Sequence, residues 1–530
     1  MPLAPHGERV AAVEPFVRPP VVLEAARTST ASARERAVPL LVAAAVLAGV
    51  AVRLFAFARN PSLWVDEAML ALNVLGRSPA ELLEPLDWNQ GAPVGYLLLA
   101  KLSVTVFGGS EFALRLPSLV AGILGLVAFV PLAYRLMPLP AARLAVVLFA
   151  FSPYLVGYSA EFKQYELDAT ISVGLVALAV PVWRNEAGPG RVVGFALGGA
   201  AAVWFSHPST FILAGVGFAA LADAAVRRDR AGLLARLAVV AAWLVSFGTC
   251  YALFLGKLGM NEYLLNYWNG KFLPLELRPG TAAWVVHHFV EFFEKPGGMA
   301  ATAIAASGLA AVLYLLGAMA LARADWRLLV ALVAPLVLAM AASALKKYPF
   351  AGRLLLFAVP AALMLIAYGT AVIAPAISRA VPGGGGLLVF AVLLGPVMHT
   401  HWLTKSPLHA EDTREVVAHV RDRWQPGDRA YVFWAAVPAL RYYTADAPFP
   451  ADAIRYGVER RDRDPRLLHT ELQTFRGNPR VWVVIAHRHP QEEAGIQGYL
   501  DGLGVCEETV RKTDAVAFRY DLSRPPVPPR

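Results

Sequence analysis

Most of the chain consists of apolar runs separated by short polar segments. Each run is roughly 20 residues long, the length of an α-helix that crosses about 30 Å of hydrocarbon. A segment in lipid must satisfy its own backbone hydrogen bonds, so the runs are expected to be helices. They predict a polytopic α-helical membrane protein with about eleven transmembrane helices. The runs are residues 38–57, 115–136, 141–158, 168–183, 191–206, 208–226, 235–256, 300–322, 327–345, 353–374 and 386–402.

One further apolar run, residues 92–107, decides the predicted topology. If this run crossed the membrane, the arginines between the later spans would face outward, against the positive-inside rule. Pro93, Gly95 and Lys101 allow it to lie in the outer interface instead. The N-terminus is then cytoplasmic and the C-terminus is outside. The outer side receives residues 58–114, 159–167, the turn at His207, 257–299, 346–352 and the chain after 403.

The two ends of the chain differ from the apolar runs. Residues 1–37 are rich in Pro, Ala and Arg without an apolar period, and they predict a disordered cytoplasmic tail before a membrane domain over 38–402. From residue 403 the charge density rises, and short β-rich runs alternate with helical stretches. This pattern predicts a small extracytoplasmic α/β domain over 403–524 and a Pro-rich tail over 525–530. The β-rich runs are residues 431–434, 481–485 and 515–518.

Composition and charge exclude several classes of protein. Hydrophobic residues make up 57% of the chain and charged residues 16%, with a mean hydropathy of +0.51, which excludes a water-soluble globular enzyme. Arginines at the ends of spans account for the net charge of +9, so no nucleic-acid partner is expected. Richness in Ala and Arg with few lysines suggests a GC-rich bacterial genome and hence a bacterial plasma membrane. The sequence has no P-loop, dinucleotide-binding or zincin motif, so it gives no support for nucleotide hydrolysis, dinucleotide chemistry or zincin proteolysis.

The first candidate site is the acid pair Asp66-Glu67, which follows the first span on the predicted outer side. A carboxylate near the membrane core is costly unless it is paired or hydrated, so this pair is a functional-site hypothesis. The alternative is that both acids cap an interfacial helix that starts near Ala68, because acids favour helix N-termini.

A second polar cluster, residues 161–168, faces the same side between the third and fourth spans. In a helix, Glu161, Tyr165 and Asp168 would share one face. Two acidic loops that converge on one membrane face could provide a base together with a metal or sugar clamp. The alternative is a solvated helix start.

Several short motifs occur in order along the chain. They are Val65-Asp66-Glu67-Ala68, Phe107-Gly108, Leu114-Arg115-Leu116-Pro117-Ser118, Ser152-Pro153 and Glu161-x-Lys163-x-Tyr165. Together they resemble the motifs of the GT-C fold glycosyltransferases. This superfamily of integral membrane enzymes includes the lipid A aminoarabinose transferases and the protein O-mannosyltransferases, and the resemblance covers roughly residues 38–445.

The resemblance implies a sugar donor on polyprenyl phosphate, an active site on the outer face and inversion at the anomeric carbon. It also implies that Asp66 is the acid of the first outer loop, the candidate general base, and that Glu161 is the acid of the second loop. Glu67 is the third candidate catalytic carboxylate. Lys163 stands where relatives often carry arginine. Lysine keeps the positive charge, but it cannot donate the two parallel hydrogen bonds that a guanidinium makes to a phosphate or carboxylate.

Binding of the donor phosphate requires cations on the outer side. Lys346, Lys347 and Arg353 flank Tyr348 on the outer turn before the tenth span, and relatives place a basic residue after this turn. They could donate charge-assisted hydrogen bonds to the phosphate, or they could be snorkelling interfacial side chains. The other candidate substrate-binding residues are Lys163, Tyr165, Asp168 and His207.

A divalent cation such as Mg²⁺ or Mn²⁺ is a possible cofactor, with Asp66, Glu161 and His207 as its ligands. Lysines and arginines could neutralise the phosphate without a metal, and His207 could instead be a satisfied interfacial histidine. His287, His288 and Glu291 also have metal-like helical spacing, within a segment that reads as an amphipathic interfacial helix.

The sequence thus favours a glycosyltransferase that moves a sugar from a polyprenyl-phosphate donor to a glycan, lipid or protein acceptor of the cell envelope. The rival hypothesis is a transporter or lipid-linked-sugar flippase, which should place ionisable groups near the bilayer midplane. Most charges here fall at helix ends instead. A degenerate member that acts as an assembly subunit is the third alternative.

Overall fold

The computed structural model describes residues 33–184, 186–276, 279–299, 306–459 and 465–524. The predicted tail over 1–37 lies outside the described residues as far as position 32, and the tail over 525–530 lies outside them entirely. The chain divides into two units, residues 1–44 and 45–530. The described part of the first unit is the beginning of helix α1 (Ala33–Ala58).

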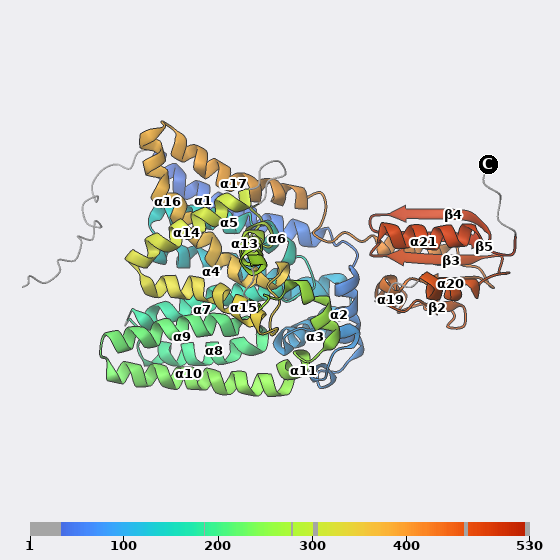
Figure 1. Ribbon diagram of the computed structural model, residues 1–530, viewed down its shortest axis with the longest axis horizontal. Helices are drawn as coiled ribbons and strands as arrows, with labels where there is room; N and C mark the ends of the chain where they lie inside the picture. The colour runs from blue at the N-terminus through green and yellow to red at the C-terminus, as the bar shows by residue number, and fades with distance from the viewer. Residues whose placement is uncertain (1–32, 185, 277–278, 300–305, 460–464, 525–530) are drawn as a thin grey trace, which may run out of the picture. The chain divides into compact units, whose positions relative to one another are not determined.

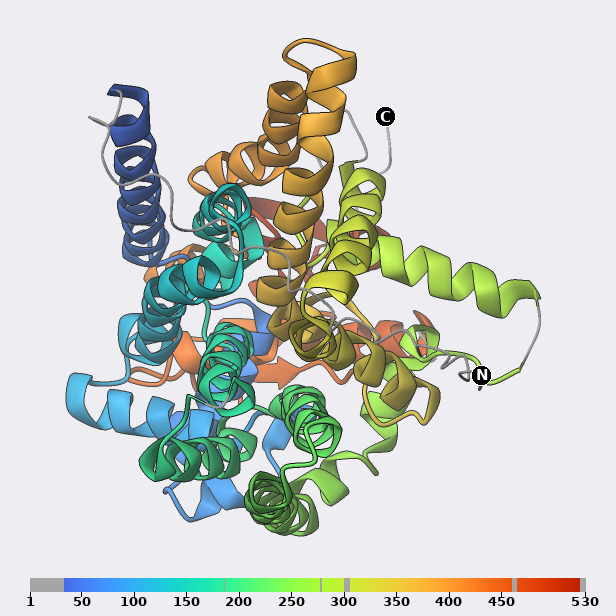
Figure 2. The same ribbon diagram turned by 90° about the vertical axis from the view of Figure 1, so that its left-hand side faces the viewer.

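The described residues include nine helices that are long and apolar enough to cross a membrane. This finding confirms a polytopic helical membrane protein. Figures 1 and 2 show three of these helices, α7, α9 and α10, packed side by side with the shorter helix α8 (Pro189–Phe205). The nine spans include α1, α4 (Glu111–Leu136), α7 (Tyr165–Trp183), α9 (Ser209–Val226), α10 (Arg230–Cys250), α14 (Ala306–Ala324), α15 (Trp326–Ala344), α16 (Val359–Ala380) and α17 (Gly384–Leu403).

Two of the predicted spans correspond to shorter helices. Helix α5 (Leu139–Ala150) stops before Ser152, and α6 (Pro153–Tyr158) begins at the following proline. Proline disfavours the helical conformation of the residue before it, which explains the break. Helix α8 (Pro189–Phe205) has 17 residues. Helix α3 (Val94–Phe107), the run predicted to lie in the interface, has only 14 residues and would extend about 21 Å; its interfacial placement stays a prediction.

Helices α14 and α16 cross with their backbones almost in contact. A Cβ atom on Gly317 would lie 2.0 Å from the carbonyl oxygen of Leu365, and one on Gly369 would lie 2.0 Å from that of Leu313. Only glycine fits at both positions. Small residues promote close packing of membrane helices in this way, since apolar side chains gain little by leaving lipid for protein.

The polar segments between spans form short helices. The first long segment contains α2 (Val65–Gly76), η1 (Glu81–Leu83), η2 (Asp87–Asn89) and α3. Helix α10 continues through a π-helical turn, η3 (Tyr251–Leu255), into α11 (Gly256–Leu258). The remaining segments carry α12 (Glu262–Tyr267), η4 (Asn269–Lys271), α13 (Pro279–Glu294) and η5 (Gly352–Ala358).

The C-terminal part of the chain contains a five-stranded sheet of order β2-β1-β3-β5-β4. Its first three strands are parallel, and β3, β5 and β4 are antiparallel. The predicted β-rich runs fall on β1, β3 and β5. The strands are β1 (Arg429–Val432), β2 (Ile454–Tyr456), β3 (Val481–Ala486), β4 (Val505–Lys512) and β5 (Ala515–Asp521).

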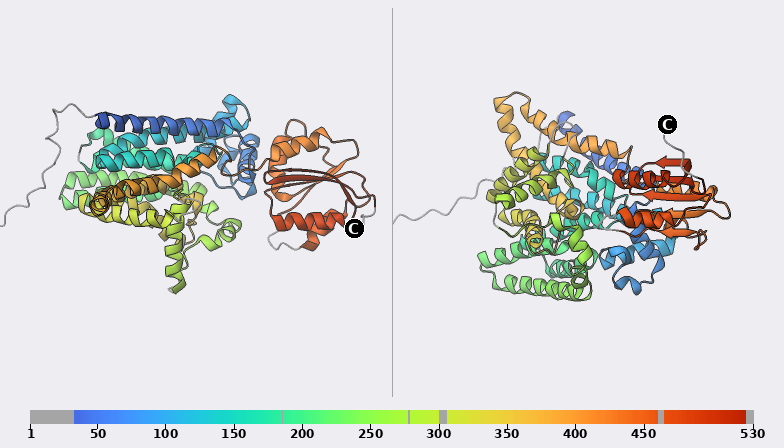
Figure 3. Two further views of the ribbon diagram at one scale, coloured as in Figure 1. Left: turned by 90° about the horizontal axis from the view of Figure 1, so that it is seen from above. Right: turned by 45° about the vertical axis from the view of Figure 1, so that its right-hand side comes forward.

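Helices cover both faces of this sheet, as Figure 3 shows. Every residue of β3 is consequently buried, which explains its unbroken apolar sequence. Helices α18 (Thr413–Asp422) and α19 (Val437–Tyr443) pack on one face, with the turn η6 (Trp434–Ala436) before α19. Helices α20 (Pro465–Gln473) and α21 (Pro490–Asp501) pack on the other.

Helix α2 packs against the C-terminal sheet as well as against its own segment. Trp64, Val65 and Met69 belong to the same apolar cluster as Tyr431 and Phe433 of the sheet region. The opposite side of α2 contacts α3 in a second cluster. The acid pair at the start of α2 therefore lies where the first polar segment and the C-terminal region meet.

Candidate functional site

Asp66 and Glu67 occupy the first turn of α2, as the capping alternative predicted. The helix macrodipole favours acids at this position. Successive helical residues point about 100° apart, so the two side chains enter different surroundings. The Asp66 side chain is 21% exposed, whereas that of Glu67 is 1% exposed.

Glu67 has donors on both carboxylate oxygens. Arg115 of α4 donates from Nε to Oε1 at 2.9 Å and from Nη2 to Oε2 at 2.6 Å, and the backbone N–H of Phe162 donates to Oε1 at 2.5 Å. Arg115 also donates to the carbonyl of Pro61 at 2.8 Å. Glu67 thus joins α2, α4 and the second polar cluster, and no oxygen is free for a substrate.

Asp66 lies between two cations. Its Oδ2 accepts from Nη2 of Arg353 at 2.5 Å and lies 3.9 Å from Nζ of Lys163, which donates to Oε1 of Gln90 at 2.9 Å. Burial alone would raise the pKa of Asp66, but the charges of Lys163 and Arg353 outweigh it and hold the pKa below its ordinary value. Asp66 is therefore ionised at neutral pH.

Lys163 is almost fully buried beside these groups. Burial lowers its pKa to about 8, although the neighbouring Asp66 opposes the shift. Its charge is consequently sensitive to any anion that enters the site. Aromatic rings flank the second cation: the guanidinium of Arg353 lies 5.1 Å from the ring centroid of Trp64 and 5.8 Å from that of Tyr165.

Glu161 lies opposite these groups with one oxygen paired and one free. Its Oε1 is 2.8 Å from Nδ1 of His409, whose ring stacks on Trp64 at 4.1 Å. Its Oε2 is buried and has no hydrogen-bond partner. Burial would lower the pKa of His409, but the carboxylate of Glu161 raises it above the ordinary value. Glu161 therefore keeps one buried acceptor oxygen beside the imidazole of His409.

The helical arrangement predicted for residues 161–168 is wrong for Glu161. Helix α7 begins only at Tyr165, and residues 159–164 form turns after α6. Tertiary hydrogen bonds hold these turns: Phe162 donates to Glu67, and Ser118 donates to the carbonyl of Lys163 at 3.0 Å. Asp168 is buried in the first turn of α7, and its Oδ1 has no partner.

Only one of the three cations predicted around Tyr348 reaches the acids. Arg353 pairs with Asp66, whereas Lys346 and Lys347 are exposed at the end of α15. Lys346 has a left-handed φ of 53°, which turns the chain away from the helix. Tyr348 donates to the carbonyl of Leu354 at 2.6 Å, and burial raises its pKa well above the ordinary value.

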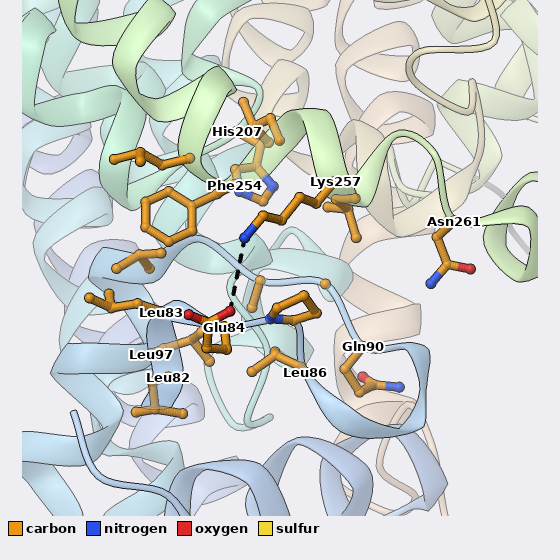
Figure 4. A pocket seen from close by; sticks show the side chains of 17 residues that line it. Leu82, Leu83, Glu84, Leu86, Gln90, Leu97, His207, Phe254, Lys257 and Asn261 are labelled. Atoms are coloured by element: carbon orange, nitrogen blue, oxygen red, sulfur yellow. Dashed lines mark ion pairs between the residues drawn. The ribbon is translucent and has the colours of Figure 1, made fainter. Parts of the chain in front are cut away.

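His207 lines a cavity of about 110 Å³ rather than a metal site with Asp66 and Glu161. Figure 4 shows this cavity, in which Lys257 forms an ion pair with Glu84 at 3.9 Å. Burial lowers the pKa of His207 to about 4, so the imidazole is neutral. Among the described residues, the groups that could ligate a metal are His287–His288–Glu291 and Glu411–His487–Asp514. Asp66, Glu161 and His207, the ligands expected from the sequence, do not form such a group among the described residues.

The sequence reasoning missed His409, Arg115 and Gln90. Arg115 belongs to the motif Leu114-Arg115-Leu116-Pro117-Ser118, but the sequence pattern does not indicate that it pairs with Glu67. His409 lies in the irregular segment after α17, 248 positions from Glu161, and carries no periodic or motif signal. Gln90 lies in the first polar segment, and its contact with Lys163 is likewise tertiary.

Comparison with solved structures identifies the fold. ArnT from Cupriavidus metallidurans bound to undecaprenyl phosphate matches with a TM-score of 0.54 and 12% identity, over 91% of this chain and 97% of that chain. The apo state of that ArnT gives a TM-score of 0.52 and 13% identity, over 93% and 99% of the two chains. The Archaeoglobus fulgidus oligosaccharyltransferase in complex with Zn and sulfate matches with a TM-score of 0.51 and 12% identity, over 90% of this chain and 73% of that chain.

These proteins are GT-C fold glycosyltransferases, so the chain has the GT-C fold, as the sequence motifs predicted. The matches extend over the C-terminal region as well as the membrane helices, since they cover at least 90% of this chain. Comparisons with protein-family models and with curated proteins give no match.

Proposed function

We propose that the protein is a glycosyltransferase that moves a sugar from a polyprenyl-phosphate donor to a cell-envelope acceptor, on the outer face of a bacterial plasma membrane. The observation that carries the proposal is the position of Asp66, ionised between Arg353 and Lys163, the second of which lies two residues after Glu161 in the chain. The shared fold with an ArnT that binds undecaprenyl phosphate supports a lipid-linked donor.

Arg353 and Lys163 would bind the donor phosphate. Both cations lie beside Asp66, so an entering phosphate finds two donors at one place. The phosphate would also raise the pKa of Lys163 from about 8, which keeps the lysine charged in the complex. Negative charge grows on the leaving phosphate during transfer, so these contacts strengthen in the transition state.

Asp66 would act as the general base. It accepts the proton of the acceptor hydroxyl while that oxygen bonds to the anomeric carbon, and the bond from this carbon to the phosphate oxygen breaks. The phosphate leaves with the electron pair and needs little protonation. Attack from the face opposite the phosphate inverts the anomeric carbon. The free Oε2 of Glu161 would accept a hydrogen bond from a donor or acceptor hydroxyl.

The charges around the two acids do not fit a Mg²⁺ or Mn²⁺ site. Asp66 is already paired with Arg353 and Lys163, and Oε1 of Glu161 is paired with His409, so a divalent ion would face two cations beside Asp66 and an occupied oxygen on Glu161. These side chains supply the positive charge that the phosphate needs. The proposed mechanism therefore has no step through a metal.

The test compares a deletion strain complemented with wild type, Asp66→Asn or the matched control Asp87→Asn. Asp87 lies in the same polar segment but is 71% exposed. Mass spectrometry of polyprenyl-phosphate sugars and envelope glycans should show an accumulated donor and a missing glycan for Asp66→Asn only. Full transfer by an equally expressed Asp66→Asn protein would exclude the proposed base.

The rival is a transporter or lipid-linked-sugar flippase. The observation that bears on it is Glu166, which is fully buried in the first turn of α7 and has no hydrogen-bond partner on either carboxylate oxygen. This position is at a helix end rather than near the midplane, where a transporter should place its ionisable groups. Translocation of a lipid-linked sugar by reconstituted protein, with no covalent product, would support this rival against the transferase.

A further inference from the structure

A second cluster of ionisable groups lies outside the catalytic acids. Glu411 precedes α18, His487 follows β3, and Asp514 lies in the turn between β4 and β5. Nδ1 of His487 is 2.7 Å from Oε1 of Glu411 and 3.9 Å from Oδ2 of Asp514. One ligand atom from each residue lies within 4.8 Å of the other two.

These separations suit a small divalent ion. In a tetrahedral zinc site with bonds of about 2.1 Å, two ligand atoms lie about 3.4 Å apart. The two separations from Nδ1 of His487 fall on either side of this value, so shifts of about 1 Å would bring the three atoms onto one ion. An imidazole with two carboxylates is a donor set that zinc accepts, with a water in the fourth position.

The two carboxylates are oriented as metal ligands usually are. The outer oxygen of Glu411, Oε2, accepts from the backbone N–H of Val65 at 3.1 Å, and Oδ1 of Asp514 accepts from the backbone N–H of Arg488 at 3.0 Å. Each carboxylate therefore turns its other oxygen toward His487. Hydrogen bonds of this kind fix the orientation of metal-binding carboxylates.

Arg488, the cation next to His487 in the sequence, is paired with a carboxylate outside the cluster. Nε of Arg488 lies 2.5 Å from Oε2 of Glu493. The cluster His287–His288–Glu291 differs in this respect, because Nζ of Lys271 lies 3.1 Å from Oε1 of Glu291 and already neutralises it. Glu411–His487–Asp514 is thus the better cation site of the two.

We propose that Glu411, His487 and Asp514 bind one Zn²⁺ ion that fastens the C-terminal sheet to helix α2. The link to α2 is the hydrogen bond from Val65 to Glu411, because Val65 is the residue before Asp66. The ion would replace the proton shared by His487 and Glu411. The ion would hold the start of α2 in place without contacting the catalytic acids.

The experiment measures metal content rather than activity. Full-length protein in detergent is treated with EDTA, incubated with Zn²⁺, separated from free metal by gel filtration and measured by inductively coupled plasma mass spectrometry. We expect about one zinc per chain for the wild type. His487→Ala and Asp514→Asn should weaken binding by more than roughly tenfold.

Three controls separate this site from others. His469→Ala removes a histidine of the same region that stacks on Tyr499, and it should retain zinc. The double variant Asp66→Asn/Glu161→Gln should retain zinc as well, which distinguishes the site from the catalytic acids. The variant His287→Ala/Glu291→Gln should also retain zinc, which distinguishes the site from the other cluster.

No zinc in the wild type, or equal zinc in wild type and Asp514→Asn, would overturn the proposal. Loss of zinc only in the catalytic or His287 variants would overturn it too. Asp514→Asn replaces a side chain that is 35% exposed, so it tests the site even if His487→Ala fails to fold.

Discussion

Two neighbouring carboxylates differ because of what surrounds them. Glu67 is held by Arg115 and the Phe162 amide, whereas Asp66 meets two cations and keeps part of its surface exposed. A base must exchange partners during a reaction, and only Asp66 can do so without breaking a buried bidentate ion pair. The assignment of catalysis to Asp66 and of positioning to Glu67 follows from this difference in partners.

Lys163 gives the proposed reaction a pH dependence. Its pKa of about 8 in the free enzyme means that the lysine is charged below that pH and loses its charge above it. We expect kcat/KM for the donor to fall as pH rises through about 8, because phosphate binding loses one cation. In Lys163→Arg the fall should move to higher pH, since arginine stays charged.

The measurement is the pH profile of kcat/KM with purified protein and a synthetic polyprenyl-phosphate sugar. Lys346→Arg is the matched control, because Lys346 is exposed and lies away from Asp66. Its profile should coincide with that of the wild type. An unchanged alkaline limb in Lys163→Arg would contradict the role given to Lys163.

At the scale of elements, the Glu67–Arg115 pair joins α2 to α4. Both side chains are only 1% exposed, so Glu67→Gln leaves a buried guanidinium without its counter-charge. We expect a loss of about 3–5 kcal/mol in the free energy of unfolding. The exposed pair Arg135–Glu186 provides the control, and Glu186→Gln should change stability by less than about 1 kcal/mol.

Thermal unfolding in detergent, followed by circular dichroism, compares the two variants. A Glu67→Gln protein as stable as the control would mean that the pair contributes little. Donor binding should weaken in Glu67→Gln as well, since Phe162 and Lys163 lie in the turns that Glu67 holds.

The elements also show what the sequence could and could not predict. Runs of apolar residues located the long helices, because a span in lipid needs a length and a composition that one segment contains by itself. The turn that carries Glu161 was predicted as helix, since its shape depends on hydrogen bonds to Glu67 and Ser118. Arg353 was one of three candidate cations around Tyr348, and the sequence could not tell it apart from Lys346 and Lys347, because its pairing with Asp66 depends on the tertiary fold.

At the scale of the whole molecule, the C-terminal region either forms part of the site or only covers it. The segment between α17 and α18 contacts both acidic loops. His409 pairs with Glu161, and Glu411 accepts from the first backbone N–H of α2. Leu408 packs against Gly157, where an added Cβ would lie 2.2 Å from its Cδ1 atom. These contacts join segments that are hundreds of residues apart, so no local pattern predicts them.

Deletion of residues 404–530 should therefore abolish donor cleavage together with transfer. The truncated protein lacks the partner of Glu161 and the cap of α2, so the site cannot keep its arrangement even though the membrane helices remain. Glu411→Gln is the matched single change: it weakens the proposed zinc site, but the new glutamine can still accept from Val65 and His409 stays beside Glu161, so donor cleavage should persist. Release of sugar from a radiolabelled donor measures both. Cleavage by the truncated protein at the wild-type rate would show that the C-terminal region only covers the site.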